Sequence, residues 1–320
     1  MTGGTFNERI GDYLEAHIGI FKESTLKEQR SKLNRLSRIF DELIDEGLIS
    51  TAQPDHIGER EIRYLVQYMK EHDISPATQQ KYLQIVNNYL RYCGNLSGES
   101  AKRVLGIHPV KKPIDVLSAE EVGRIFDTIE RMSGWRGSVA RGMIYLSFET
   151  LARPEEIRTA LVQDLDMINH RFFIRNPKGK GSYSDSQWVD LIRPDFFKEL
   201  DSYLAERDAY LSRKGVRNDA LFPNLYGENG QYSGNAQREL MRRVSDRSGV
   251  EFSLKMFRAT GSDLFISADP SNLYAISAQL RHSNIATTQK YYADIQRSKV
   301  AERLGDSYKN IPIPKSPKDP

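Results

Sequence analysis

The sequence predicts a mainly α-helical protein with one small β-hairpin, an α+β fold in two domains. Apolar residues recur at helical spacing through the first hundred residues. A short segment with two prolines and two lysines, Ile107–Ile114, then interrupts this pattern. Farther along, a glycine-rich turn separates two short runs typical of strands. A chain of 320 residues is long enough for two domains that each bury a core.

The first domain, expected at residues 1–107, is predicted to be a bundle of helices. Leucine and phenylalanine recur at spacings of three, four and seven over residues 26–43, which makes one apolar stripe that Gly47 ends. A similar stripe covers residues 59–71. The Ser75–Pro76 pair predicts a further helix start, because serine favours the capping position and proline the first helical position. Basic residues on the polar faces can meet phosphates or be solvated (Lys27, Arg30, Lys81, Arg91).

A linker is predicted at residues 108–114, because its prolines disfavour a helix and its lysines keep it solvated. The second domain is expected at residues 115–320. The capping box Ser118–Glu121 predicts that a helix begins this domain. An apolar helix is expected over residues 143–148, directly before a segment that contains Arg153.

A β-hairpin is predicted next, with strands at residues 171–175 and 187–191. Its glycine-rich turn carries Lys178 and Lys180. Helices are expected after the hairpin, at residues 195–213, 234–248 and 255–265. A C-terminal tail is predicted from about residue 293, and its Ile-Pro-Ile-Pro end is expected to be extended.

The composition limits the class of protein. A net charge of +3 is weak support for nucleic acid binding, so a DNA surface must come from local clusters of basic residues. The single cysteine, Cys93, excludes an internal disulfide and a cysteine-based metal site, and a buried thiol is expected. The sequence contains no apolar run of membrane length and no signal-peptide core, so no membrane partner and a cytoplasmic location are expected.

Arginine and lysine residues suited to phosphate binding occur in two places. Arg153 precedes Pro154 at the end of the apolar helix, and Glu156 follows three residues later, close enough to orient the guanidinium. The planar fork of arginine can donate two hydrogen bonds to one phosphate. Lys255 and Arg258 are three residues apart, so on a helix they share a face. A surface ion pair and a basic helix face are the simpler alternatives for these two patterns.

A histidine and a tyrosine form the strongest motif. His282 lies in Leu-Arg-His-Ser, with Arg281 before it, and Tyr291 follows nine residues later. Tyr292 is adjacent, but neighbouring helical positions point about 100° apart, so only one of the two tyrosines can face a given substrate.

Taken in order, these segments resemble the catalytic boxes of the tyrosine recombinase (phage integrase) family over about residues 114–295. Thr150-Leu-Ala-Arg153 is similar to the family's Thr-Gly-Leu-Arg, with Asp164 as the acidic residue that closes the box. Lys255 stands where histidine is usual, and Arg281 where glycine is usual in Leu-Gly-His-Ser. The spacing from the histidine in the family selects Tyr291 as the nucleophile.

The resemblance implies the roles of the site residues. Tyr291 attacks a DNA phosphate, Arg153, Arg258, His282 and Lys255 stabilise the pentacoordinate state, and Glu156 supports Arg153. A hairpin lysine, Lys178 or Lys180, protonates the leaving 5′ oxygen. The product is a 3′-phosphotyrosyl bond, which conserves the bond energy, so no metal, nucleotide or other cofactor is implied.

The resemblance also implies a helical, SAM-like core-binding domain followed by a tyrosine-recombinase catalytic domain. The two domains are expected to clamp double-stranded DNA, with four protomers acting on two duplexes as a homotetramer. The segment after Tyr292 is expected to dock on a neighbouring protomer. Two alternatives remain: a type IB topoisomerase-like enzyme that nicks and reseals DNA, and a binding-only regulatory protein. The DNA target, the direction of recombination and any accessory directionality protein stay open.

Overall fold

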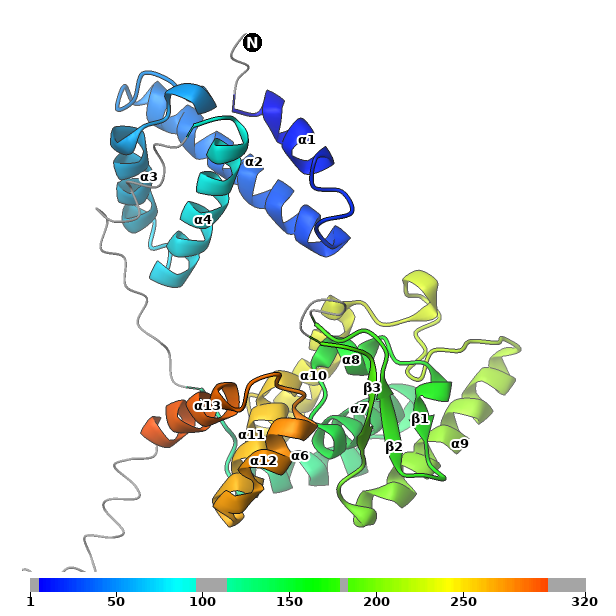
Figure 1. Ribbon diagram of the computed structural model, residues 1–320. Coiled ribbons are helices and arrows are strands. Elements are labelled where there is room, and N and C mark those ends of the chain that lie inside the picture. The colour runs from blue at the N-terminus through cyan, green and yellow to red at the C-terminus, as the bar shows by residue number, and fades with distance from the viewer. Residues whose placement is uncertain (1–5, 96–113, 179–183, 299–320) are drawn as a thin grey trace, which may run out of the picture. The chain divides into compact units, whose positions relative to one another are not determined.

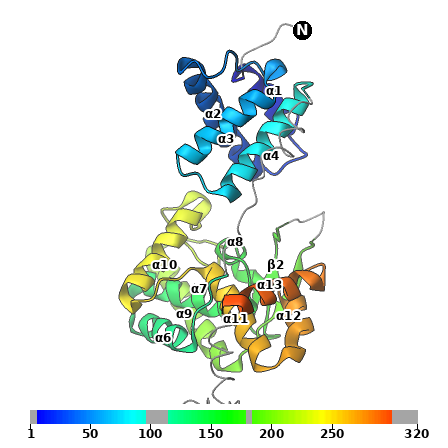
Figure 2. The same ribbon diagram turned by 90° about the vertical axis from the view of Figure 1, so that its left-hand side faces the viewer.

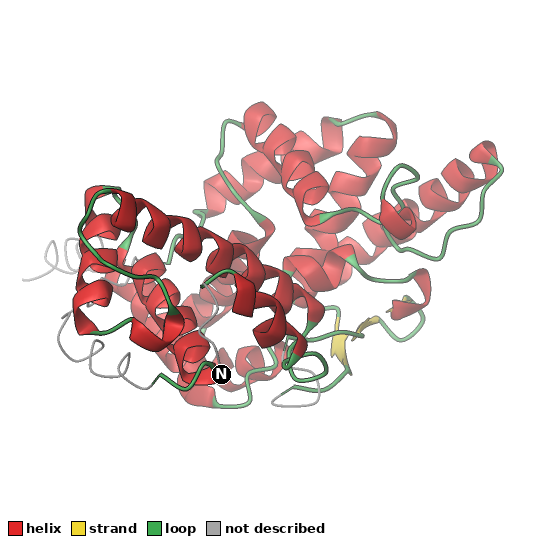
Figure 3. Cartoon of the chain, turned by 90° about the horizontal axis from the view of Figure 1, so that it is seen from above, coloured by secondary structure: helices red, strands yellow, loops and turns green. Residues whose placement is uncertain are grey.

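The computed structural model describes residues 6–95, 114–178 and 184–298 (Figure 1). The chain divides into two compact units, Met1–Lys112 and Pro113–Pro320, each with its own hydrophobic core. All of the predicted linker except Ile114 lies outside the described residues. Helices make up most of the described chain, as predicted, and its strands form one small sheet (Figure 3). None of the described helices is long and apolar enough to cross a membrane.

The N-terminal unit packs its helices around one core of apolar side chains. The stripes predicted from spacing are buried, and Gly47 ends the longest helix with a φ of +71°. The first, two-turn helix was not predicted, because it is too short to show a periodic pattern. The described helices are α1 (Glu8–Glu15), α2 (Glu23–Asp45), α3 (Glu59–Glu71) and α4 (Pro76–Tyr92), with a 3-10 turn at Pro54–His56.

Two details of this unit differ from the prediction. Ser75 precedes α4 as expected, but its hydroxyl bonds the Thr78 hydroxyl (2.9 Å) and caps no backbone N–H. Cys93 is only partly buried, because it lies just past the last turn of α4. Its thiol packs against the edge of the core, and burial raises its pKa.

The second unit is built around α7 (Gly134–Thr150), which packs against helices on several sides. From Gly137 to Thr150 every residue of α7 except Arg141 is buried, because its apolar residues cover the whole circumference. The neighbouring helices are α6 (Ala119–Arg131), α9 (Phe197–Lys214), α10 (Gly234–Ser248) and α11 (Leu254–Ala268). The predicted capping box at the start of α6 is present, with Ser118 and Glu121 bonding each other's backbone N–H groups. A helix so enclosed gives a rigid support for the residues that follow it.

The sheet contains the predicted hairpin and one more strand. β2 (Arg171–Ile174) pairs antiparallel with β3 (Gln187–Asp190), and β1 (Leu165–Asp166) pairs with the other edge of β2. The two-residue strand β1 is too short for a sequence pattern to reveal. Lys178 lies just past β2 and is exposed, while Lys180 lies outside the described residues.

Three helices close the C-terminal end of the described chain. α11 contacts α12 (Leu273–Gln279), which in turn packs against α13 (Ile285–Ser298), and the three lie together in both side views (Figures 1 and 2). α13 continues past residue 293, where the tail was predicted to begin, and the chain after Ser298 lies outside the described residues. A short helix, α8 (Pro154–Arg158), follows α7.

Candidate active site

The turn Leu280–His282, between α12 and α13, meets the turn Leu151–Arg153 that joins α7 to α8. Their meeting point is held by side chains from four helices, and each of its main contacts involves a residue that the sequence singled out. Arg258 of α11 lies under both turns: it donates one hydrogen bond to the Leu151 carbonyl and one to the Leu280 carbonyl (2.9 Å for the second). The guanidinium is therefore fixed by two backbone carbonyls before any ligand is bound.

Leu151 occupies a position where the family motif has glycine, and its backbone keeps the conformation that glycine favours. Its φ is +49°, in the left-handed region, and its side chain is fully buried. Room for that side chain comes from Gly261 on α11, where an added Cβ would lie only 2.5 Å from a Leu151 methyl carbon. The left-handed turn reverses the chain after α7 and points the Leu151 carbonyl toward Arg258.

Arg153 and Glu156 form the pair that the sequence predicted. Arg153 is the residue before α8, and Glu156 accepts hydrogen bonds from both its backbone N–H (2.7 Å) and its guanidinium (2.9 Å). The Arg153 side chain is 28% exposed and Glu156 only 3%. This pair is therefore no ordinary surface ion pair: the carboxylate is enclosed, and the arginine reaches from it to the surface.

Arg281 joins the same carboxylate, a contact that the sequence did not predict. Its guanidinium donates to the second oxygen of Glu156 (2.5 Å) and to the Gln279 carbonyl (3.3 Å), and its side chain is completely buried. Its φ is +57°, so this second glycine position of the motif also keeps a left-handed backbone with a larger residue. Only the departure from Leu-Gly-His-Ser marked Arg281 in the sequence.

His282 is held by α13. Its Nδ1 lies 2.7 Å from the Thr288 hydroxyl, which also contacts the Ser277 hydroxyl (3.0 Å). Burial, with the positive charges of Arg258, Arg153 and Arg281, lowers the pKa of His282 to about 4. The ring is therefore neutral at physiological pH, and Nε2 is the nitrogen left to meet a substrate.

The lysines lie outside this buried cluster. Lys255 is exposed at the start of α11 and lines a cleft of about 990 Å³ between α8, α10 and the segment before α11. Lys178 is exposed beyond β2, and no contact joins it to the arginine cluster within the described residues. The base of its turn is anchored, because Arg175 pairs with the buried Asp164. Asp164 thus connects the hairpin to the segment after α8.

Tyr291 belongs to α13, and its side chain lies outside what the structure describes. Its position on the helix is three residues after Thr288, within one turn of the residue that contacts His282. Tyr292 is half-buried and packs on the small apolar cluster of Leu151, Ile266, Ile276 and Leu280. Tyr292 therefore has a packing role in this unit.

The arrangement as a whole suits an oxyanion. Two guanidinium groups, of Arg153 and Arg281, pair with the Glu156 carboxylate, and Arg258 donates to the Leu151 and Leu280 carbonyls, so this site gathers three arginines. A doubly anchored arginine and a partly exposed arginine lie close enough to the imidazole of His282 to lower its pKa. Such fixed donors are what a phosphoryl group needs when charge develops on its oxygens.

The sequence model of the phage integrase family matches residues 115–298, more than half of the chain and almost the whole described catalytic unit. The chain belongs to the phage integrase family. The tyrosine recombinase predicted from the sequence is thereby confirmed, and site-specific DNA recombination is the activity of this family member.

Solved structures show that this integrase has the tyrosine recombinase fold. The Tn1549 transposon integrase in complex with transposon right end DNA is 18% identical, with a TM-score of 0.65 over 94% of this chain and 100% of that one. The XerH site-specific recombinase bound to palindromic difH substrate is 18% identical, with a TM-score of 0.67 over 94% and 96%. A lambda integrase dimer bound to a COC′ core site is 14% identical, with a TM-score of 0.63 over 91% and 78%. No curated protein matches this sequence.

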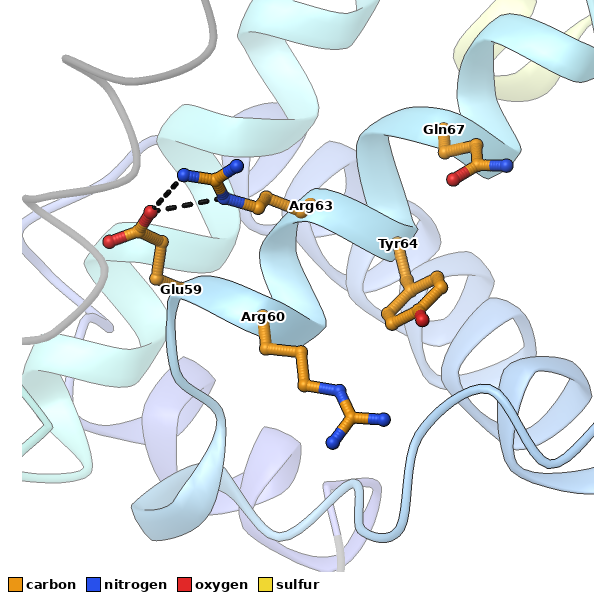
Figure 4. A pocket seen from close by; sticks show the side chains of 5 residues that line it. All are labelled: Glu59, Arg60, Arg63, Tyr64 and Gln67. Atoms are coloured by element: carbon orange, nitrogen blue, oxygen red, sulfur yellow. Dashed lines mark hydrogen bonds and ion pairs between the residues drawn. The ribbon is translucent and has the colours of Figure 1, made fainter.

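The N-terminal unit of the integrase carries a separate shallow hollow on α3 (Figure 4). It has a volume of about 540 Å³ and is lined by Glu59, Arg60, Arg63, Tyr64 and Gln67. The Arg63 guanidinium is paired with Glu59, while the Arg60 guanidinium lies 5.8 Å from the centre of the Tyr64 ring. Two arginines, a glutamate, an aromatic ring and an amide make this face of α3 polar.

Proposed function

We propose that this integrase cleaves and rejoins double-stranded DNA with Tyr291 as nucleophile, through a 3′-phosphotyrosyl intermediate. The observation that carries the proposal is the convergence of Arg153, Arg258 and His282 where two turns meet, and the turn with His282 leads into the helix of Tyr291. A cluster of donors that is assembled without ligand needs little reorganisation when the reaction begins.

The proposed roles follow from the contacts of each side chain. Arg153, partly exposed and tied to Glu156, binds one non-bridging oxygen of the scissile phosphate. Arg258, held by two carbonyls, binds the same phosphate from the side of α11. His282 is neutral before DNA binds, and its Nε2 is proposed to form a hydrogen bond to the phosphate. Lys255, at the edge of the cleft, adds a mobile positive charge next to the DNA backbone.

The reaction exchanges one ester for another. The Tyr291 oxygen forms a bond to phosphorus as its proton passes to solvent water, and the bond from phosphorus to the 5′ oxygen breaks. Lys178 or Lys180 donates the proton that turns this oxygen into a 5′ hydroxyl. A tyrosine has a pKa of about 10 in water, and neighbouring cations favour its anionic form in the transition state. Attack by a 5′ hydroxyl on the phosphotyrosine reverses the step and rejoins the strand.

We propose double-stranded DNA as the partner because the similar structures of the Tn1549 integrase, XerH and lambda integrase are complexes with DNA. The N-terminal unit is proposed to contribute a second DNA-binding surface. A homotetramer on two duplexes and a cytoplasmic location are part of the same proposal, since strand exchange needs four cleavages on accessible DNA. Nothing in the described residues favours the topoisomerase-like or binding-only alternatives.

The test is to trap the covalent intermediate on a pool of duplexes, so that the target sequence need not be chosen beforehand. The library contains duplexes with a randomised binding sequence, each nicked near the cleavage point. The short fragment that carries the new 5′ hydroxyl then diffuses away, so the strand cannot be rejoined and stays attached to the protein. Denaturant-resistant adducts are then isolated, sequenced and digested to map the linked residue. We expect the DNA-linked residue to be Tyr291.

Tyr291→Phe should abolish the adduct and leave duplex binding intact, because only the nucleophilic oxygen is removed. Tyr292→Phe is the matched control: it keeps the packed ring and should form adduct at nearly the normal rate. An adduct on any other residue, or a normal adduct in Tyr291→Phe, would refute the assignment.

A further inference from the structure

Arg281 is buried at the centre of the site, yet the proposed reaction assigns it no role. Its side chain is fully enclosed, and its Nε is buried without a hydrogen-bond partner in the described residues. Enclosing a guanidinium is costly unless a charged partner compensates. The left-handed backbone adds a further cost, which a glycine at this position would avoid. Such costs at one residue indicate that its contacts serve the site.

The contacts of Arg281 all concern the placement of other groups. The Arg281 guanidinium and the Arg153 backbone N–H both donate to Oε2 of Glu156. The Arg153 guanidinium donates to Oε1 of the same carboxylate. The carboxylate is thus clamped from both sides, which leaves Arg153 a single orientation for its pairing. Without Arg281, Glu156 could rotate about its side-chain bonds, and Arg153 would move with it.

The same residue connects the two halves of the site. The carbonyl before it, of Leu280, accepts from Arg258, and the ring after it, of His282, contacts Thr288 of α13. The buried ion pair between Arg281 and Glu156 therefore fixes the Arg153 segment relative to the turn Leu280–His282. That turn carries the Leu280 carbonyl, which accepts from Arg258, and the His282 ring.

We propose that Arg281 is a positioning residue of the active site: through the shared carboxylate of Glu156 it sets the orientation of Arg153 toward the scissile phosphate. It does not touch the substrate, because its side chain is sealed from solvent. The inference rests on the proposed function, and it assigns to this chain a device that the glycine of the family motif could not provide.

The test compares adduct formation on one duplex recovered from the library. Arg281→Met keeps most of the side-chain volume but removes the donors, and we expect single-turnover cleavage to fall about 100-fold, with duplex affinity changed less than about threefold. Arg281→Lys retains the charge and should recover at least about tenfold of that loss. Combining Arg281→Met with Glu156→Gln should cost little more than the larger single loss, because both act through one contact.

The pH profile separates positioning from a general loss of structure. Arg281 is one of three cations that lower the pKa of His282, the others being Arg153 and Arg258. Its removal in Arg281→Met should raise that pKa and move the acid limb of the cleavage profile to higher pH, whereas Arg281→Lys should leave the limb in place. A merely destabilised fold would lower the rate at every pH without moving the limb.

Arg141→Met is the matched control. Arg141 also pairs with a glutamate and also has a buried Nε without a partner in the described chain, but it lies in the first half of α7. The Arg141→Met variant should therefore cleave DNA at the normal rate. If wild type forms adduct and Arg281→Met matches its rate and pH profile, the inference is wrong and the proposed function stands. If wild type forms no adduct with any duplex, both fall together.

Discussion

The carboxyl group of Glu149 should make this protein less stable as the pH rises through neutrality. Glu149 lies near the end of α7 with no exposed surface. One oxygen accepts the Arg193 N–H (2.7 Å), and the other has no hydrogen-bond partner among the described residues. Burial raises the pKa of Glu149 to about 7, and the backbone N–H groups of Arg193 and Ile192, just after β3, only partly oppose it.

The sign follows from proton linkage. In the unfolded chain the pKa is about 4.5, so between about pH 4.5 and 7 the folded state binds the proton more tightly, and stability falls with rising pH. The full effect is on the order of 3 kcal/mol above about pH 8, from 1.36 kcal/mol for each unit of pKa difference. Glu149→Gln resembles the protonated acid at every pH. Its stability relative to wild type should therefore improve by about 3 kcal/mol between about pH 5 and pH 8.5.

Urea unfolding measures this in the full chain. Both tryptophans, Trp135 and Trp188, belong to the catalytic unit, so tryptophan fluorescence reports the unfolding of that unit alone. The titration of His282 has the opposite sign, with stability lost as the pH falls from about 6.5 toward 4, but it is common to both proteins and cancels in the difference. A difference between variant and wild type that is the same at the two pH values would refute the reasoning.

Two further predictions concern the site. Gly261→Ala should lower the free energy of unfolding by about 1–3 kcal/mol, because the new methyl group meets the buried Leu151 side chain; the loss should shrink when Leu151→Ala is added, and urea unfolding of the four proteins checks this. Lys178→Ala or Lys180→Ala, whichever is the acid, should slow cleavage about 100-fold on an ordinary duplex, yet cleave normally when sulfur replaces the leaving 5′ oxygen, because a thiolate leaves without a proton. If neither variant responds to the sulfur substitution, the acid lies elsewhere.

Much of the fold could be predicted because its helices are long and carry regular apolar stripes. The bounds of α3 and α10 agree with prediction, since clear stop and start residues flank both. Two-residue β1 and two-turn α1 escaped, because a periodic pattern needs more residues than they have. The capping role predicted for the Ser75 hydroxyl from local sequence was also wrong, because this hydroxyl bonds the Thr78 hydroxyl and no backbone N–H.

The candidate site was predictable as a set of residue types in order, and much less so as a set of contacts. Spacing linked Arg153 to Glu156, because the two are close in sequence. It could not link Glu156 to Arg281, since those residues are more than a hundred positions apart and meet only through the packing of α8 against the turn after α12. The low pKa of His282 likewise arises from arginines brought together by the fold, and no local pattern encodes it.

The fit between Leu151 and the bare backbone of Gly261 has a consequence for how this family can diversify. Glycine in place of Leu151 would leave an empty volume facing α11, and a side chain in place of Gly261 could fill it. We therefore expect the two positions to covary over evolution, with a large side chain at one of them when the residue at the other is small. Changing the residue at only one of the two positions would break this complementarity and displace the Leu151 carbonyl, which anchors Arg258.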